Sequence, residues 1–392
     1  MKGNAKIIGV GMVKFTKPGL NEPYEMMAPK AIQHAINDAG IDFREIKQAF
    51  ASYVYGDSTS GQASLYKVGM SGIPVINVNN NCSSGSTALY LARQAVESGV
   101  VDCALAFGFE EMQPGRLKSK WDDRTSPLKS FNERLDELVE NNAPQGAIKF
   151  FGEAGTTYIK KYGANPDIFA KVAVKTRNHA LNNPYSIFDK PLTVEEVLNT
   201  PVIYPPYLTR LMACPPSCGA AAVIVCSEDF ARKHGHEYAV EIVAQSLSTD
   251  TEESLKDPIN LVGADMTRRA SSEVYEKAGI GPEDVDVVEL HDCFTPNEVI
   301  TYEGLGLCGE GEAESFINNG DNTYGGKYVV NPSGGLMSKG HPLGATGLAQ
   351  CTELVWQLRG QANKRQVENA KIALQHNLGL GGAAVVTMYK RP

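Results

Sequence analysis

The sequence lacks any run of about 18 consecutive apolar residues, which a membrane-spanning helix needs, and no long apolar segment follows Met1. A membrane span and a secretory leader are therefore not expected. Excess positive charge is also missing, since 37 Lys and Arg stand against 45 Asp and Glu, and the net charge of −8 does not imply nucleic-acid binding. The segment that ends at Pro392 is not a Ser-Lys-Leu peroxisomal signal. These absences predict a cytoplasmic protein with no nucleic-acid partner and no integral membrane association.

Cysteine is sparse for the length of the chain. Eight cysteines among 392 residues do not make the dense pattern of a disulfide framework, so a reducing compartment is expected. The sequence has no Cys-x-x-Cys or His-x-x-x-His pair of the kind that marks zinc sites, and we expect no bound metal. Hydrophobic residues make up 42% and charged residues 21% of the chain, as is typical of a folded globular protein.

The chain is long enough for at least two hydrophobic cores, and it repeats itself. A helix that ends at Gly40 is followed by a short loop and a strand, and a similar pattern surrounds Gly279. Cys82 and His341 each stand before a helix that begins with small residues. Each half then closes with a strand rich in Gly and Ala. Chance resemblance of ordinary βα units is the alternative, but the shared order of these features favours duplication.

Apolar strands and helices alternate along most of the chain, which predicts an α/β architecture with covered sheets. The segment at about 113–212 breaks the repeat, is rich in Lys, Asp, Asn and Pro, and is expected to form an inserted loop domain that binds substrate. We therefore divide the chain into an N-terminal half at 1–235, which carries the insertion, and a C-terminal half at 236–392. Strands are expected at 6–10, 48–55, 74–77, 103–107, 220–226, 239–245, 285–289, 371–375 and 383–388, and helices at 23–38, 84–97, 151–161, 166–181, 266–278, 296–304 and 346–360.

Cys82 follows an expected strand and precedes a helix whose first turn is rich in Ser and Gly. The positive end of the helix dipole favours a thiolate there, and small neighbours let a ligand approach the backbone. The alternative is a buried cysteine that behaves as a small apolar residue. His341, which lies between Gly340 and Pro342, is the expected base for this thiol. An exposed side chain in a glycine-rich turn is the alternative for His341.

His291, Asp292 and Cys293 end an apolar strand, which is where α/β proteins place ligands. Strand alternation predicts that His291 and Cys293 share one face and that Asp292 points the other way. A zinc site is the rival interpretation, but it needs further ligands. Near the C-terminus, the glycine-rich segment 379–382 follows another strand. It is either a tight turn or a place where a backbone N–H faces an oxyanion.

Five stretches match one family in sequence and in order: Asn77–Cys82, Glu289–Phe294, Asn331–Gly335, Gly340–Gly347 and Gln375–Gly379. With them the chain resembles the thiolases, and more closely the sterol-carrier-protein-2 type of thiolase, over essentially its whole length. The resemblance implies the thiolase fold, in which two duplicated βαβαβαββ halves form a five-layered αβαβα arrangement with an inserted loop domain. It also implies a homodimer or a tetramer.

The resemblance assigns roles to the residues already singled out. Cys82 matches the acylated nucleophile, and His341 matches its activator. His291 stands where ordinary thiolases carry an Asn of the first oxyanion hole. The backbone N–H groups of Cys82 and Gly379 match the second oxyanion hole, which serves the acyl-enzyme.

The second catalytic thiol departs from the ordinary pattern. Ordinary thiolases take it from a Cys-x-Gly motif near the C-terminus, and here that place is Asn377-Leu378-Gly379. The sterol-carrier type supplies it from the His-Asp-Cys-Phe motif, which gives the acid/base role to Cys293. A related aldolase branch lacks the catalytic cysteines.

The implied reaction is CoA-dependent cleavage of a 3-oxoacyl-CoA, or the reverse Claisen condensation, through an acyl-cysteine. CoA and acyl-CoA are then substrates, and no cofactor is bound permanently. Lys118, Lys120 and Arg124 in the insertion form either a solvated basic face or a site for the CoA phosphates. Two alternatives stay open: a retro-aldolase acting on a β-hydroxyacyl-CoA, which needs neither thiol, and a non-catalytic subunit that binds acyl-CoA or lipid. Because the chain ends at Pro392, a carboxyl-terminal sterol-carrier domain is not expected.

Overall fold

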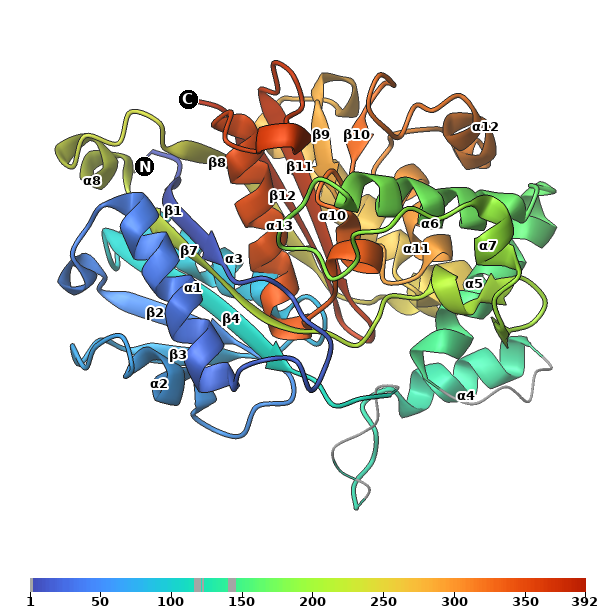
Figure 1. Cartoon of the computed structure of the whole chain (residues 1–392), viewed down its shortest axis with the longest axis horizontal. Helices are drawn as coiled ribbons and strands as arrows, with labels where there is room; N and C mark the ends of the chain where they lie inside the picture. Colours follow the sequence, from blue (N-terminus) through green and yellow to red (C-terminus); the bar gives the residue numbers. More distant parts are fainter. Residues whose placement is uncertain (1–2, 116–120, 122, 140–145) are drawn as a thin grey trace.

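A single sheet of ten strands forms the body of the computed structural model, which describes residues 3–115, 121, 123–139 and 146–392 (Figure 1). The strands lie in the order β10-β9-β11-β12-β8-β1-β7-β4-β2-β3, and β5 and β6 form a separate ribbon. Their bounds are β1 (Lys6–Met12), β2 (Gln48–Ser52), β3 (Val75–Val78), β4 (Cys103–Glu111), β5 (Val202–Tyr204), β6 (Leu208–Thr209), β7 (Cys218–Cys226), β8 (Val240–Ser248), β9 (Val287–Glu289), β10 (Val329–Val330), β11 (Ile372–Gly379) and β12 (Ala383–Lys390).

The sheet consists of two halves with the same topology. From its outer edge inward, the first half runs β3-β2-β4-β7-β1 and the second runs β10-β9-β11-β12-β8. In each half the outer three strands are parallel and the inner pairings are antiparallel. The halves join where Lys6 and Ile7 of β1 pair with Glu241 and Val240 of β8. The equal strand orders confirm the duplication that the sequence predicts. The expected boundary after residue 235 falls between α8 and β8 and stays a prediction.

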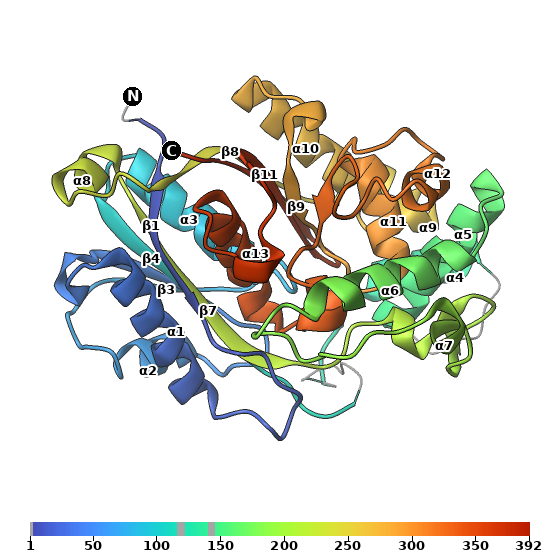
Figure 2. The same ribbon diagram turned by 45° about the horizontal axis from the view of Figure 1, so that its top comes forward.

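Helices fill the space between the half-sheets and cover their outer faces (Figure 2). Helix α3 contacts β2 and β4, while α13 contacts β4, β7, β9 and β11 as well as α3. Helix α1 covers β1 and β7 on one outer face, and α10 covers β8 and β12 on the other. The expected αβαβα layering is therefore present, with the two half-sheets hydrogen-bonded to each other at β1 and β8. The helices are α1 (Tyr24–Ala39), α2 (Ser60–Leu65), α3 (Ser84–Glu97), α4 (Lys129–Leu138), α5 (Ala147–Tyr162), α6 (Asp167–Ala180), α7 (Val194–Leu198), α8 (Glu228–Lys233), α9 (Pro258–Leu261), α10 (Ala264–Ala278), α11 (Thr295–Gly304), α12 (Ala313–Asn318) and α13 (Leu343–Leu358).

Small residues let the two central helices approach each other at their N-terminal ends. A Cβ on Gly85 of α3 would lie 3.0 Å from the carbonyl of Gly344 in α13, which is tighter than ordinary contact. A Cβ on Gly347 would collide with Ser86. Larger side chains at these positions would push the helices apart. The close approach brings together the segments that precede the two helices.

The inserted region 113–212 contributes α4 to α7 and the β5-β6 ribbon. Helices α5 and α6 pack against α11, so this region lies over the C-terminal half (Figure 1). None of the helices in the described ranges is long and apolar enough to cross a membrane.

Candidate active site

Cys82, His291 and His341 meet in one place, although they come from three separate segments. One side-chain atom of each lies within 4.8 Å of those of the other two. Cys82 stands between β3 and α3, and His341 stands between the π-helix η5 (Gly335–Lys339) and α13. The contact between the starts of α3 and α13 therefore makes these two residues neighbours, and His291 joins them from the segment after β9.

His341 presents a lone pair on Nε2. Its Nδ1 lies 2.7 Å from Thr346 Oγ1, and the same hydroxyl donates its hydrogen to the carbonyl of Pro342 at 3.0 Å. A hydroxyl has only one hydrogen, so Thr346 must accept a hydrogen bond from Nδ1–H. Nε2 is buried and has no hydrogen-bond partner among the described residues. It is the nitrogen that can take a proton from Cys82.

His291 has the opposite tautomer. The side-chain amide nitrogen of Asn377 lies 3.2 Å from the carbonyl of Cys82 and 3.1 Å from His291 Nδ1. Because this nitrogen donates to the carbonyl, it also acts as a donor toward Nδ1, and the proton of His291 resides on Nε2. His376 supports the arrangement, since its Nδ1 accepts the backbone N–H of His291 at 3.4 Å. The site thus contains one imidazole acceptor and one imidazole donor.

The thiol and the base are both neutral at rest. Burial raises the pKa of Cys82 to about 12, and the nearby Glu110 carboxylate adds to this rise. Burial also lowers the pKa of His341 to about 3. The sequence argument favours a thiolate through the dipole of α3, but the structure favours the thiol. Loss of solvation is the larger effect, because no cation of the described residues lies beside the sulfur to offset it.

We expect the alkylation of Cys82 by iodoacetamide to rise about tenfold per pH unit between about pH 7.5 and 9.5, because only the thiolate reacts and the pKa lies well above this window. Mass analysis of the peptide that contains Cys82 measures the rate. Cys308, whose pKa burial also raises to about 12, serves as an internal reference without a histidine cluster. A rate for Cys82 that is already constant at pH 7.5 would mean a preformed thiolate–imidazolium pair.

Cys293 lies beside this cluster, opposite a second cysteine. Ala213 and Phe294 form an antiparallel bridge, and the N–H of Cys214 donates to the carbonyl of Cys293 at 2.9 Å. Burial raises the pKa of Cys293 well above its ordinary value, and the thiols of Cys214 and Cys82 act in the same direction. Cys293 is therefore held as a protonated thiol, which is the form that a general acid requires.

The strand-alternation argument for His291 and Cys293 is wrong, because β9 ends at Glu289 and both residues follow the strand. Their placement comes instead from the bend between β9 and α11. Asp292 is turned toward another element, where it accepts the N–H of Leu336 at 2.7 Å. It is fully buried and engaged, so it does not complete a zinc site with its two neighbours.

Gly379 lies against the segment that carries Cys82. A Cβ at this position would collide with the carbonyl of Asn80 and the hydroxyl of Ser83, so only glycine fits. One residue farther on, the carbonyl of Leu380 accepts the side-chain amide of Asn81 at 3.0 Å. The backbone of Gly379 is thus next to the cysteine, as a shared oxyanion hole requires. The role of Gly379 itself stays a prediction.

Glu110 lies behind the cluster and ties the two halves of the chain together. Its carboxylate accepts the backbone N–H groups of Val54, Tyr55 and Gly344, at 3.1, 3.0 and 3.1 Å. Burial raises the pKa of Glu110 to about 7, although the three donors oppose the rise. The sequence analysis did not single out this residue. Its only signal is a glutamate within the apolar strand Cys103–Glu111.

Cys82, His291 and His341 are also the one set of three Cys, His or carboxylate ligands that lie close enough, in the described part of the chain, to hold a metal ion. Sulfur and imidazole nitrogen are donors that zinc accepts. The expectation that no metal is bound therefore stays a prediction.

The remaining residues singled out by sequence lie elsewhere. Lys118 and Lys120 fall outside the described residues. Arg124 is exposed, pairs with Asp123 at 2.8 Å and lies over the ring of Trp121.

The comparisons with known proteins cover the whole chain. Residues 6–200 match the family "Thiolase, N-terminal domain", and residues 248–390 match "Thiolase C-terminal domain-like". A protein named sterol carrier protein 2 from Oryctolagus cuniculus is 53% identical over 98% of this chain and 71% of its own length. The benzoylsuccinyl-CoA thiolase subunit BbsB of Thauera aromatica is 34% identical over 98% of this chain and 97% of its own length.

Solved structures agree on the fold. A structure titled "Ltp2-ChsH2(DUF35) aldolase" superposes with a TM-score of 0.84, covers 100% of this chain and 98% of that chain, and is 22% identical. Human mitochondrial 3-ketoacyl-CoA thiolase in complex with CoA gives a TM-score of 0.74 at 18% identity, and covers 99% of this chain and 98% of that chain. At these identities the likeness concerns the fold alone.

Proposed function

Because this chain belongs to the thiolase family, we propose that it is an acyl-CoA C-acyltransferase that cleaves 3-oxoacyl-CoA with CoA, or runs the reverse condensation. The observation that carries the proposal is the convergence of Cys82, His291 and His341 within 4.8 Å, with Cys293 beside them. CoA and acyl-CoA are its substrates in this proposal, and the matched family supports the acyltransferase class.

The first half-reaction transfers the acyl group to Cys82. Nε2 of His341 removes the thiol proton, and the sulfur attacks the keto carbon of the substrate. The tetrahedral intermediate collapses, and the bond between the keto carbon and C2 breaks. His291 donates its Nε2–H to the oxygen of the departing enolate. Cys293 protonates C2, which releases acetyl-CoA, or propionyl-CoA from a 2-methyl substrate, and leaves a Cys293 thiolate.

The second half-reaction returns the enzyme to its starting state. Cys293 takes the thiol proton of the incoming CoA, whose sulfur attacks the acyl group on Cys82. Cys82 leaves as a thiolate and recovers its proton from His341. Two neutral thiols and two neutral imidazoles are restored, in agreement with the protonation of the resting site. The backbone N–H groups of Cys82 and Gly379 are the proposed donors to the oxyanion in this step.

Intact-mass spectrometry after mixing with acetoacetyl-CoA tests the proposal. An acyl adduct on Cys82 that free CoA discharges is the expected result. Binding of the intact acyl-CoA without an adduct would instead support a lipid-binding subunit or the retro-aldolase. The aldolase fold neighbour keeps that second candidate open, but its reaction would require neither thiol. Cleavage of a β-hydroxyacyl-CoA that iodoacetamide does not inhibit would favour the retro-aldolase.

We propose that the assembly is a homodimer formed through β3. This strand ends the ten-stranded sheet, so its outer backbone edge has no strand partner among the described residues (Figure 1). Ile76 on β3 is 41% exposed, and Tyr66 and Met70 between α2 and β3 are also exposed. An exposed apolar edge strand is a liability in a monomer and a natural pairing surface in a dimer.

Size-exclusion chromatography with light scattering should give about twice the chain mass of 42.3 kDa for the wild type. Ile76→Lys should shift the mass toward the monomer, because a charge would be buried between the paired edges. Tyr238→Lys is the matched control, since Tyr238 is also a large exposed side chain, is 76% exposed and lies between α8 and β8. A monomeric wild type, or a shift with the control alone, would contradict an interface at β3. A mass about four times that of the chain would indicate a further interface.

A further inference from the structure

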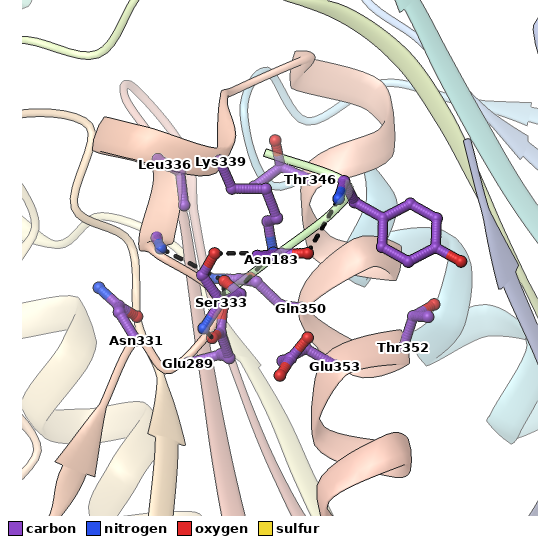
Figure 3. A network of polar contacts seen from close by, with 12 residues as sticks. Asn183, Glu289, Asn331, Ser333, Leu336, Lys339, Thr346, Gln350, Thr352 and Glu353 are labelled. Carbon is purple, nitrogen blue, oxygen red and sulfur yellow. Dashed lines mark hydrogen bonds and ion pairs between the residues drawn. The ribbon is translucent and has the colours of Figure 1, made fainter. Parts of the chain in front are cut away.

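The residues on either side of His291 both reach the π-helix that leads to His341. Glu289 ends β9, and Asp292 follows His291 directly. The π-helix η5 ends at Lys339, two residues before His341. Figure 3 shows Glu289, Ser333, Leu336 and Lys339 gathered between the end of the strand and this helix. The segment 289–292 therefore carries the imidazole of His291 and also contacts the π-helix that leads to the imidazole of His341.

The first contact fixes the N-terminal end of η5. The Asp292 carboxylate accepts the backbone N–H of Leu336 at 2.7 Å and that of Met337 at 3.3 Å. Gly335 begins the helix with φ +58, and a Cβ there would collide with this carboxylate. The carboxylate thus satisfies N–H groups that the first turn of a helix leaves free. It sets the position at which η5 starts.

The second contact fixes the C-terminal end. Lys339 is 1% exposed, and its Nζ lies 3.6 Å from Glu289 Oε2 without a hydrogen-bond partner in the described chain. Glu289 is fully buried and accepts the N–H of Ser333 at 3.0 Å and its hydroxyl at 2.8 Å. Asn183 continues the network by donating to the carbonyl of Ser333 at 2.8 Å (Figure 3).

Stability alone does not account for this ion pair. Removing an ammonium and a carboxylate from water is costly, and a well-packed apolar pair of the same volume is often as stable or more stable. Lys339 does not regain the loss through hydrogen bonds, since none of its ammonium hydrogens has a partner among the described residues. Ion pairs of this kind are best attested where they select one arrangement of two elements. Here the two elements are β9 and η5.

We propose that the Glu289–Lys339 ion pair is a positioning device that holds His341 over Cys82. Fixed at Asp292 and at Lys339, η5 has one placement relative to β9, and His341 follows it after Gly340. Lys339 and Glu289 touch no reacting atom, and they act through His341. The inference rests on the proposed function only for the role of His341, because the geometry of the thiol and the base can be measured without any acyl-CoA.

At about pH 6 the pathway through the free thiolate is slow, and the alkylation rate of Cys82 by iodoacetamide then reports on proton transfer to the base beside it. Lys339→Met should lower this rate by about 10- to 100-fold, as displacement of a catalytic group by about 1 Å does. In a His341→Ala background the same substitution should add no further loss, because the two residues act as one unit. Glu289→Gln with Lys339→Met leaves no unpaired charge and carries the test if the single variant fails to fold. It should alkylate as slowly as Lys339→Met.

Arg359→Met is the matched control. The Arg359 side chain is 7% exposed and pairs with Asp38 at 2.8 Å, and this ion pair joins the C-terminal end of α13 to α1. The control should lower the melting temperature as Lys339→Met does and change the alkylation rate by less than about twofold. An equal loss of rate in the control would reduce Lys339 to a stabilising residue. A wild-type rate in the double variant, or a further loss in the His341→Ala background, would also overturn the proposal.

Discussion

Cys82→Ala should remove the acyl adduct completely and lower turnover of acetoacetyl-CoA with CoA by about 10⁴-fold or more, as loss of a nucleophile does in enzymes with a covalent intermediate. No other thiol can take its place at the base. His341 Nε2 is aimed at the cluster that contains Cys82, and Cys293 is the acid in the proposed scheme. The rate of acetyl-CoA formation measures turnover, and intact mass measures the adduct.

Cys103→Ala is the control for this substitution. Cys103 begins β4 at the end away from Glu110 and is fully buried. It lies opposite Cys226 in the antiparallel register of β4 and β7. Its loss should destabilise the core slightly and leave the acyl adduct intact, because the change removes one sulfur from an apolar environment. Turnover near the wild-type level in Cys82→Ala would contradict the covalent mechanism. An adduct that persists in that variant would assign the nucleophile to another residue.

Sequence patterns predict the architecture well because the duplication repeats each strong signal. All nine expected strands are present, and the helix expected at 84–97 has those bounds. The missed strand β10 has only two residues, Val329 and Val330, and is defined by parallel pairing to β9 rather than by its own periodicity. The strands of the β5-β6 ribbon have only three and two residues. Elements of this length carry no pattern that a sequence can show.

For the candidate site, too, the sequence predicts some features and not others. Cys82 and His341 could be predicted because each stands before a helix that begins with small residues, and His291 because it follows a strand of an α/β sheet. Their protonation could not be predicted, since it depends on Thr346, Asn377 and the surrounding burial.

The positions of two further residues, Cys214 and Lys339, could not be predicted from the sequence. Cys214 lies beside Cys293 through the pairing of Ala213 with Phe294, which are far apart in the chain. Lysine is almost never fully buried, so nothing in the sequence indicates that Lys339 is enclosed. Both placements are set by long-range contacts.

Cys293→Ala should separate the two chemical tasks of the site. The variant should still transfer an acetyl group from acetyl-CoA to Cys82, because that step forms no carbon–carbon bond and CoA can leave as a thiolate without the proton of Cys293. It should lose cleavage of acetoacetyl-CoA by about 10²- to 10⁴-fold, which is the usual contribution of a general acid or base. Burial keeps Cys293 protonated until an enolate develops beside it, so the proton is present when the bond breaks.

Exchange of the methyl protons of acetyl-CoA with deuterated water isolates the step that Cys293 performs. This exchange should disappear in Cys293→Ala and persist in the wild type, because removal of a proton from C2 is the reverse of its delivery. Cys214→Ala is the informative comparison, since Cys214 lies opposite Cys293 and burial raises its pKa as well. If Cys214→Ala loses the exchange while Cys293→Ala keeps it, Cys214 is the acid. Loss of acetyl transfer in Cys293→Ala would show instead that the thiol must protonate the departing CoA thiolate or shapes the site around Cys82.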